Sequence, residues 1–180
     1  FAPTGVGAIY IKEKYLKSVK PYQTGGATIN EVEFSGSTLL DSPYMFEAGT
    51  QNIAGVIGFA KALEYLNHIK YENIESIEHK VFAYLDQELA KLPDIIFYND
   101  ISDSLGSRSF NFKGIVHDDI GILLDKMNIA VRVGHHCAQP IMKQLGIKGT
   151  IRVSISFYTD YVDVDKLIEA LKRALSMLKD

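Results

Sequence analysis

The chain has 180 residues, 47% of them hydrophobic, and a formal net charge of −3 at pH 7, a composition typical of a globular protein with one good core. The small acidic excess gives no reason to expect a nucleic acid or an anionic membrane as a partner, and no apolar run approaches the ~20 residues of a membrane span. The single cysteine, Cys137, argues against a disulfide framework and favours a reducing compartment, so we expect a cytoplasmic protein.

The first third of the chain predicts four segments. Gly5 to Ile11 alternates small and β-prone residues and predicts a buried strand. The polar stretch over 12–20 predicts a short helix. Residues 21–50 show no periodic pattern, and an irregular segment of that length is uncommon unless it has a function. Apolar residues at helical spacing then predict a helix over 52–65.

The rest of the chain predicts helices packed on a small sheet, beyond a domain boundary at 67–73. The expected helices and strands alternate, with helices over 74–91, 118–127, 139–145 and 162–178 and strands over 94–99, 108–113, 129–133 and 150–157. This order is that of an α/β fold, with the second part an α+β sandwich. We therefore expect two domains, over 1–66 and 67–180.

Residues 132–140 read Arg-Val-Gly-His-His-Cys-Ala-Gln-Pro. A lone cysteine is more often a small buried hydrophobe, but neighbouring cations and exposure favour a nucleophilic thiolate. Arg132, His135 and His136 supply such neighbours, and Gly134 permits a tight turn, so we expect Cys137 to be reactive and exposed on a loop. A metal site is the alternative, although contiguous side chains do not easily converge on one tetrahedral ion.

Two further positions are candidates for binding anions. Arg152 lies on the strand after the Cys137 loop, and its planar guanidinium suits a carboxylate; a surface ion pair is the ordinary alternative. Gly49 and Thr50 precede a helix and offer backbone N–H groups and a hydroxyl to a phosphate, although Thr50 or Asn52 can equally be a simple N-cap. His117 we interpret as an ordinary surface or helix-cap histidine.

Three blocks of sequence resemble one known family, the group II (SufS-like) cysteine desulfurases of the class-V pyridoxal 5′-phosphate (PLP) aminotransferases. The blocks are Ala-Pro-Thr-Gly-Val-Gly over 2–7, Phe-Glu-Ala-Gly-Thr-Gln-Asn over 46–52, and the motif over 132–140, with a weaker fourth over 152–158. The resemblance implies a PLP-dependent transferase of fold type I. Residues 1–66 would be the tail of its PLP-binding large domain and 67–180 its small C-terminal domain.

The resemblance also implies an activity and a role for each candidate residue. Cys137 would take sulfur from L-cysteine as a persulfide and release alanine. Arg152 matches the residue that holds the substrate carboxylate. Thr50, beside Gly49, matches the residue that reaches the PLP phosphate of the neighbouring subunit in a homodimer, and Arg132 and His136 match residues that flank the nucleophile. The persulfide would pass to a SufE- or SufU-like acceptor protein for iron–sulfur cluster assembly.

The start of the chain limits this expectation. In the family the lysine that carries PLP lies just upstream of the Pro-Thr-Gly turn, which places it before Phe1. We therefore expect the C-terminal portion of a longer enzyme, with no desulfurase activity of its own. A selenocysteine lyase on the same scaffold and a non-catalytic module for acceptor docking or dimerisation are the alternatives.

Overall fold

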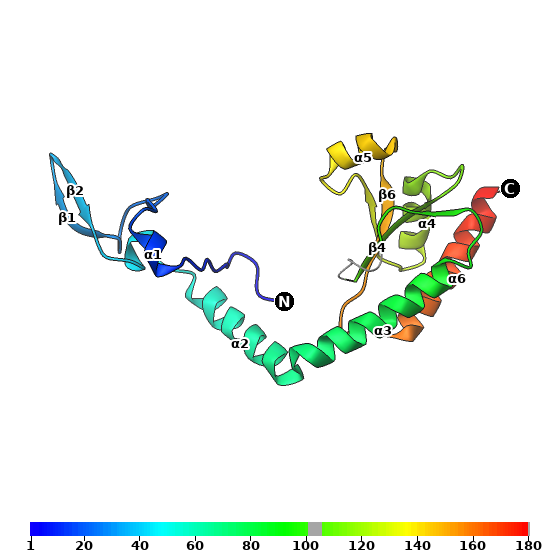
Figure 1. Ribbon diagram of the computed structural model, residues 1–180, viewed down its shortest axis with the longest axis horizontal. Helices are drawn as coiled ribbons and strands as arrows, with labels where there is room; N and C mark the ends of the chain where they lie inside the picture. Colours follow the sequence, from blue (N-terminus) through cyan, green and yellow to red (C-terminus); the bar gives the residue numbers. More distant parts are fainter. Residues whose placement is uncertain (101–105, 180) are drawn as a thin grey trace. The chain divides into compact units, whose positions relative to one another are not determined.

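The structure is a computed structural model that describes residues 1–100 and 106–179. It divides into two compact units, Phe1–Ile69 and Lys70–Asp180 (Figure 1). This division falls within the boundary expected at 67–73. The assignment of the two parts to a PLP-binding large domain and a small domain stays a prediction.

The first unit consists of two short elements, a hairpin and a long helix. In chain order these are α1 (Glu13–Leu16), β1 (Ile29–Glu33), β2 (Gly36–Leu39), the 3-10 helix η1 (Tyr44–Phe46) and α2 (Ile53–Ile69). The expected helices over 12–20 and 52–65 are therefore present, the first shorter and the second longer. The expectation of an irregular segment over 21–50 was wrong for the hairpin, where β1 pairs antiparallel with β2 across a turn at 34–35.

The strand expected over Gly5 to Ile11 does not form. The segment has no regular structure, and the side chains of Ile9 and Tyr10 are 89% and 86% exposed. A strand requires a neighbouring strand to accept and donate its backbone hydrogen bonds. No described strand lies beside this segment, so its β-prone sequence is not sufficient.

The start of α2 is held by Asn52 and connects two of the sequence blocks. The Asn52 Oδ1 atom accepts a hydrogen bond from the Gly55 N–H at 3.0 Å, which is N-capping. Its Nδ2 donates to the Gly5 carbonyl at 3.1 Å. Pro3 packs against Gly58 so closely that a Cβ there would lie 2.6 Å from Pro3 Cγ. The turn over 2–7 is therefore attached to the first turns of α2.

The second unit has a four-stranded sheet and four helices. Its elements are α3 (Tyr71–Leu89), β3 (Ile95–Phe97), β4 (Ser107–Phe112), α4 (His117–Lys126), β5 (Arg132–Gly134), α5 (Gln139–Leu145), β6 (Thr150–Ser154) and α6 (Tyr161–Lys179). The strand order is β3-β4-β6-β5, and every neighbouring pair is antiparallel. The expected mixed α/β class is confirmed, with β5 beginning three residues later than predicted.

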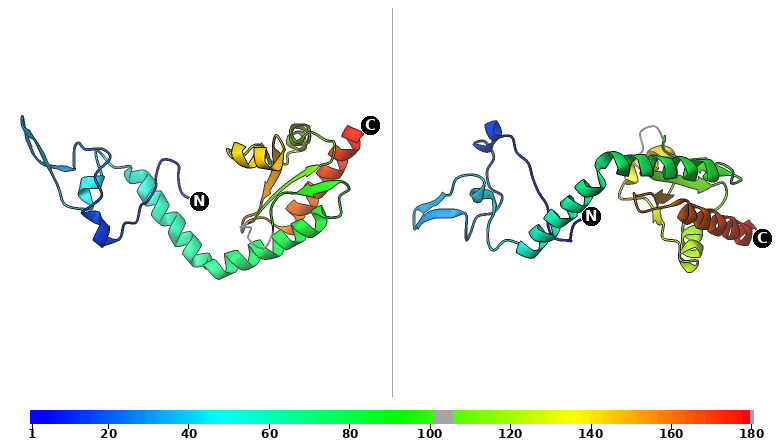
Figure 2. Two further views of the ribbon diagram at one scale, coloured as in Figure 1. Left: turned by 45° about the horizontal axis from the view of Figure 1, so that its top comes forward. Right: turned by 90° about the horizontal axis from the view of Figure 1, so that it is seen from below.

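One face of this sheet forms the core. Burial alternates along β4, where Phe110 and Phe112 are 0% and 3% exposed, and these rings pack with buried apolar residues of α3, α4 and α6. Helix α6 contacts both α3 and α4 (Figures 1 and 2). The opposite face of the sheet carries Ser109 and Asn111 of β4, Arg132 of β5 and Thr150 and Arg152 of β6, and the candidate site is built there.

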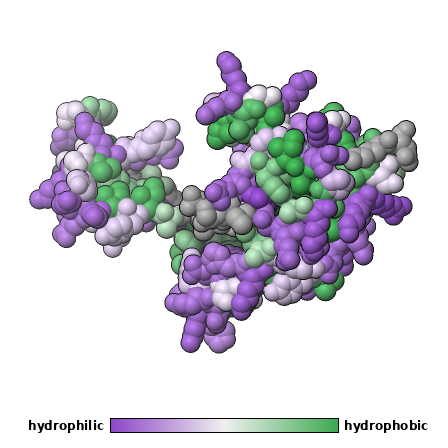
Figure 3. Space-filling model, turned by 45° about the vertical axis from the view of Figure 1, so that its right-hand side comes forward, coloured by the Kyte–Doolittle hydropathy of each residue, from purple (hydrophilic) through white to green (hydrophobic). Residues whose placement is uncertain are grey.

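Large apolar side chains are exposed in each unit, where they interrupt a mainly hydrophilic surface (Figure 3). On α2 they include Ile53, Val56 and Ile57, which are 54–66% exposed. Among the described residues no helix combines the length and the apolar character that crossing a membrane would require.

Candidate active site

The motif over 132–140 comprises β5, a short loop and the start of α5. Its backbone is unusual because Gly134, His136 and Cys137 all have positive φ, of 106°, 54° and 58°. Glycine adopts this region freely, but a residue with a side chain costs roughly 1–3 kcal/mol there. Two such residues in succession persist because specific contacts hold the loop.

Cys137 is an exposed free thiol, as expected from the sequence. Its Sγ lies 3.8 Å from an Nη atom of Arg132, and its backbone N–H donates to Nδ1 of His135 at 3.1 Å. The thiolate is the nucleophilic form of a cysteine, and a thiolate at this position would meet the Arg132 cation. The loop thus presents a sulfur to solvent with a cation against it.

His136 turns away from solvent towards β6. Its Nε2 and the hydroxyl of Thr150 are 2.8 Å apart, whereas its Nδ1 is buried without a partner among the described residues. Burial lowers the pKa of His136 below its ordinary value of 6.5, and the guanidinium of Arg152 lowers it further. Both effects favour the neutral imidazole.

Arg152 lies beside Arg132 on the open face of the sheet. The two are paired in register across β5 and β6, and Ser109 of β4 is paired with Arg152 on its other side. The Nε atom of Arg152 is buried and has no hydrogen-bond partner among the described residues. Because an unpaired buried donor is costly, this guanidinium fits an anionic ligand such as a carboxylate.

Three residues close to the candidate site lacked a signal in the sequence. Thr150 and Asn111 lie on β6 and β4, and Asn111 donates from Nδ2 to the carbonyl of Gly149 at 2.9 Å while its Oδ1 is buried and unpartnered in the described structure. His117, expected at the surface or at a helix cap, does begin α4, but its side chain is only 13% exposed. Thr150 and Asn111 are placed by strand pairing, which local sequence patterns do not show.

The predicted phosphate site lies in the first unit, separate from the residues above. The Gly49 N–H already donates to the carbonyl of Gly26 at 2.7 Å, so Gly49 offers no free amide. Thr50 is exposed and makes no hydrogen bond with the described residues through its hydroxyl, and Asn52 occupies the N-cap position of α2. The Thr50 hydroxyl, two residues before this N-cap, is thus open to an anion in the described structure, whereas the Gly49 amide is not.

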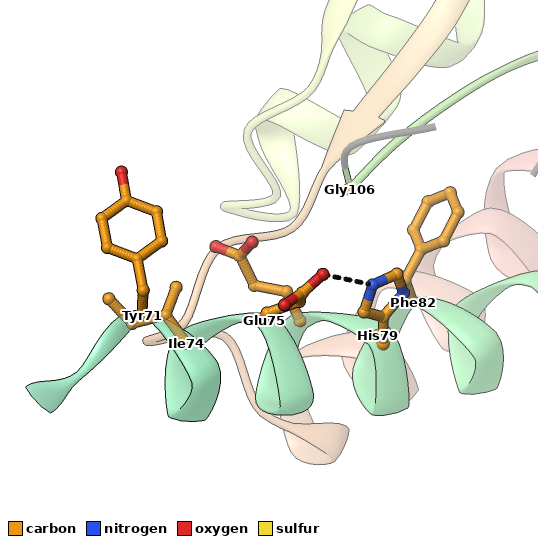
Figure 4. Close-up of a pocket in the computed structure, with 7 residues that line it drawn as sticks. Tyr71, Ile74, Glu75, His79, Phe82 and Gly106 are labelled. Carbon is orange, nitrogen blue, oxygen red and sulfur yellow. Dashed lines mark ion pairs between the residues drawn. The ribbon is translucent and has the colours of Figure 1, made fainter. Parts of the chain in front are cut away.

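No group of three or more His, Cys, Asp or Glu side chains in the described ranges could hold a metal ion. A cavity of about 240 Å³ lies against α3, between Tyr71 and Phe82 and close to Gly106 (Figure 4). Glu75 Oε1 and His79 Nε2 form an ion pair at its edge, 3.6 Å apart. No predicted site residue lines this cavity, so we place the site at the Cys137 loop.

Comparisons with known proteins give a consistent result. The family model described as aminotransferase class-V matches residues 1–167. The cysteine desulfurase CsdA of Escherichia coli K12 is 39% identical, and the match covers 100% of this chain and 44% of CsdA. A cysteine desulfurase of Wigglesworthia glossinidia brevipalpis is 38% identical over 99% of this chain and 44% of its own length.

Two solved structures resemble this one throughout. A crystal structure of E. coli CsdA in an S-sulfonic acid form matches with a TM-score of 0.91 and 38% identity, and it covers 98% of this chain and 44% of that one. The apo cysteine desulfurase of Thermococcus onnurineus NA1 matches with a TM-score of 0.92 and 37% identity, and it covers 97% of this chain and 44% of that one. The chain thus spans less than half the length of the relatives it matches.

Proposed function

Because this chain belongs to the class-V aminotransferase family, we propose that it carries the sulfur-accepting part of a PLP-dependent cysteine desulfurase. The observation that carries the proposal is the exposed Cys137 thiol with the Arg132 guanidinium 3.8 Å from its sulfur. The cysteine desulfurases with which the chain shares 38–39% identity support it.

Each site residue has one task in the proposed reaction. Arg152 binds the carboxylate of L-cysteine through its free guanidinium and so orients the substrate sulfur towards Cys137. PLP, when bound, supplies the electron sink that makes this sulfur electrophilic, and the Thr50 hydroxyl would hold a phosphate oxygen of PLP. Arg132 stabilises the Cys137 thiolate until it attacks.

The sulfur transfer balances without an external oxidant. A bond forms between Cys137 Sγ and the substrate sulfur while the bond from that sulfur to the substrate Cβ breaks. The Cys137 sulfur is oxidised to a persulfide, the substrate Cβ is reduced to a methyl group, and the thiol proton accounts for the proton gained by the product. L-cysteine and a thiol therefore become alanine and a persulfide.

The finer parts of the proposal follow from the resemblance to the group II enzymes. The protein that carries this chain would act in the cytoplasm as a homodimer, with Thr50 serving the neighbouring subunit. Its persulfide would pass to a SufE- or SufU-like acceptor for iron–sulfur cluster assembly. The exposed position of Cys137 supports transfer to another protein, because an acceptor thiol must reach the persulfide.

The test of the nucleophile uses the PLP-loaded protein that carries this chain. After incubation with L-cysteine, the peptide containing Cys137 should gain the mass of one sulfur atom, and a reductant should release that sulfur as sulfide. Cys137→Ser should abolish both signals and leave the absorption spectrum of bound PLP in place. Sulfide release at the wild-type rate from Cys137→Ser would refute the proposal.

The test of the carboxylate site is a comparison of two arginines. Arg152→Lys should raise KM for L-cysteine roughly ten- to a hundredfold, because a charge-assisted hydrogen bond to a carboxylate is lost. Arg173→Lys, on an exposed part of α6, is the matched control and should leave KM unchanged. An unchanged KM in Arg152→Lys would remove Arg152 from the substrate site.

A further inference from the structure

Thr150 is a buried polar residue with no part in the proposed chemistry. It is the first residue of β6, it is 1% exposed, and it is paired with Gly134 of β5. Its hydroxyl is hydrogen-bonded to Nε2 of His136 at 2.8 Å. Within the described residues this is the one hydrogen bond that joins the loop over 135–138 to β6.

The position of Thr150 is itself closely defined. The preceding residue, Gly149, leaves no room for a side chain, since a Cβ there would lie 2.5 Å from His117 Nε2 and 2.7 Å from the carbonyl carbon of Gly134. Its carbonyl also accepts the hydrogen bond from Asn111 of β4. Thr150 is therefore a fixed point on the sheet rather than a mobile partner.

Apart from the contact between the Arg132 guanidinium and the Cys137 sulfur, the other hydrogen bonds of the loop are local. The Cys137 N–H donates to His135 Nδ1, and the Ala138 N–H donates to the His135 carbonyl at 2.8 Å. Both partners lie within the loop, so these bonds shape it but do not attach it to the sheet. The left-handed pair His136 and Cys137 is anchored across strands by the Thr150 hydroxyl.

We propose that Thr150 is a positioning residue that, through His136, holds the Cys137 sulfur beside the Arg132 guanidinium. Thr150 touches neither substrate nor cofactor in this proposal. It fixes the imidazole of His136, and this fixes the backbone of the next residue, Cys137. This role rests on the proposed function, because Cys137 is the nucleophile of that function.

The charges around His136 agree with this role. Burial lowers its pKa most, and Arg152 of β6, Arg132 of β5 and His117 at the start of α4 lower it further, whereas a hydrogen bond to Thr150 raises it. A neutral imidazole retains a lone pair on one ring nitrogen and an N–H on the other, so it suits a hydroxyl partner in either tautomer.

The experiment compares Thr150→Val, which removes the hydroxyl at nearly constant shape, with Thr150→Ser, which keeps it. The readout is the rate of Cys137 alkylation by iodoacetamide between pH 6 and pH 9, measured in the full protein. We expect Thr150→Val to be about threefold slower at pH 7, because the loop would no longer hold the Cys137 sulfur in its exposed position beside the Arg132 guanidinium. Thr150→Ser should restore the wild-type profile.

Two controls separate this effect from a general loss of structure. Thr28→Val removes another buried hydroxyl, which in the wild type bonds with the Gly25 backbone in the first unit, and it should leave alkylation unchanged. If Thr150→Val does not fold, His136→Leu breaks the same hydrogen bond from the loop side and should slow alkylation equally.

The inference is overturned if folded Thr150→Val is alkylated at the wild-type rate or faster, if Thr150→Ser is as slow as Thr150→Val, or if Thr28→Val is slowed equally. Alkylation needs neither PLP nor L-cysteine. A failed persulfide assay in the wild type would therefore refute the proposed function and leave this measurement intact. If the wild type forms the persulfide but folded Thr150→Val is alkylated at the wild-type rate, only the role of Thr150 is refuted.

Discussion

Cys137 and Arg132 are five residues apart in the chain, and their side chains meet because the backbone between them turns back on itself. The turn uses left-handed conformations at Gly134, His136 and Cys137. This arrangement places a permanent cation against an exposed sulfur without burying either group. At the scale of residues, the site is thus a thiol, a guanidinium and the neutral imidazole of His136 behind them.

The lowered pKa of His136 predicts a pH dependence of stability. Below about pH 6.5, the ordinary value for histidine, the unfolded chain binds a proton at this residue before the folded unit does. The free energy of unfolding should therefore fall as the pH drops from 6.5 towards the lowered pKa, and His136 should have no effect above pH 6.5. Urea unfolding at pH 5.5 and pH 7.5 measures this difference.

The matched variants for this prediction are His136→Gln and His79→Gln. The first should remove part of the loss of stability at pH 5.5. The second replaces a histidine whose side chain is 69% exposed and should keep the whole loss. An identical pH dependence in wild type and His136→Gln would contradict the prediction.

At the scale of elements, β4 is attached to α3 by a charged pair within the core face. Arg108 occupies a buried position in the alternation of β4 and is 6% exposed. Its Nε lies 2.7 Å from Oδ1 of Asp86 on α3, and its guanidinium stacks 3.9 Å from the centre of the Phe97 ring. The buried charge is thus paired with a carboxylate and covered by an aromatic ring.

Removing one partner of this pair should destabilise the second unit strongly. Asp86→Ala leaves the Arg108 charge buried without its carboxylate, and we expect it to cost about 3 kcal/mol of unfolding free energy. The double variant Asp86→Ala with Arg108→Met should recover part of that loss, because no unpaired charge remains. Urea unfolding measures both, and a double variant less stable than Asp86→Ala would contradict this account.

At the scale of the whole molecule, the two units differ in how much they bury. Every residue of the first unit is described, and Thr28 and Gly55 are its two buried residues. The second unit contains the large apolar cluster around Phe110 and Leu171, both 0% exposed. Since apolar burial is the main favourable term in folding, most of the stability within the units belongs to the second.

We therefore predict that residues 70–180 fold alone and that residues 1–69 do not. The isolated second unit should unfold in one cooperative transition in urea, followed by circular dichroism and by tyrosine fluorescence. The isolated first unit should lose signal gradually from the lowest urea concentrations. A cooperative transition in residues 1–69, or the absence of one in residues 70–180, would contradict this prediction.

Segments with a periodic sequence pattern were predicted correctly, and segments that depend on pairing with another strand were not. The helices α3 and α6 and the alternating strand β4 were predicted within a few residues, because their periodic patterns depend on neighbours along the chain. The strand expected over 5–11 was wrong and the hairpin β1–β2 was missed. Both depend on whether a second segment lies alongside, and spacing in the sequence does not reveal that.

The sequence by itself determined the periodic helices of the second unit and the residue types at the candidate site, since Cys137, Arg132 and Arg152 were named from their chemistry and neighbours. The tertiary structure alone decided that Arg132 and Arg152 are paired on one face, that His117 is mostly buried, and that the Thr150 hydroxyl meets His136. The physical reason is strand register. Hydrogen bonds between β5 and β6 bring together residues that are distant in sequence, and no local pattern encodes which ones face each other.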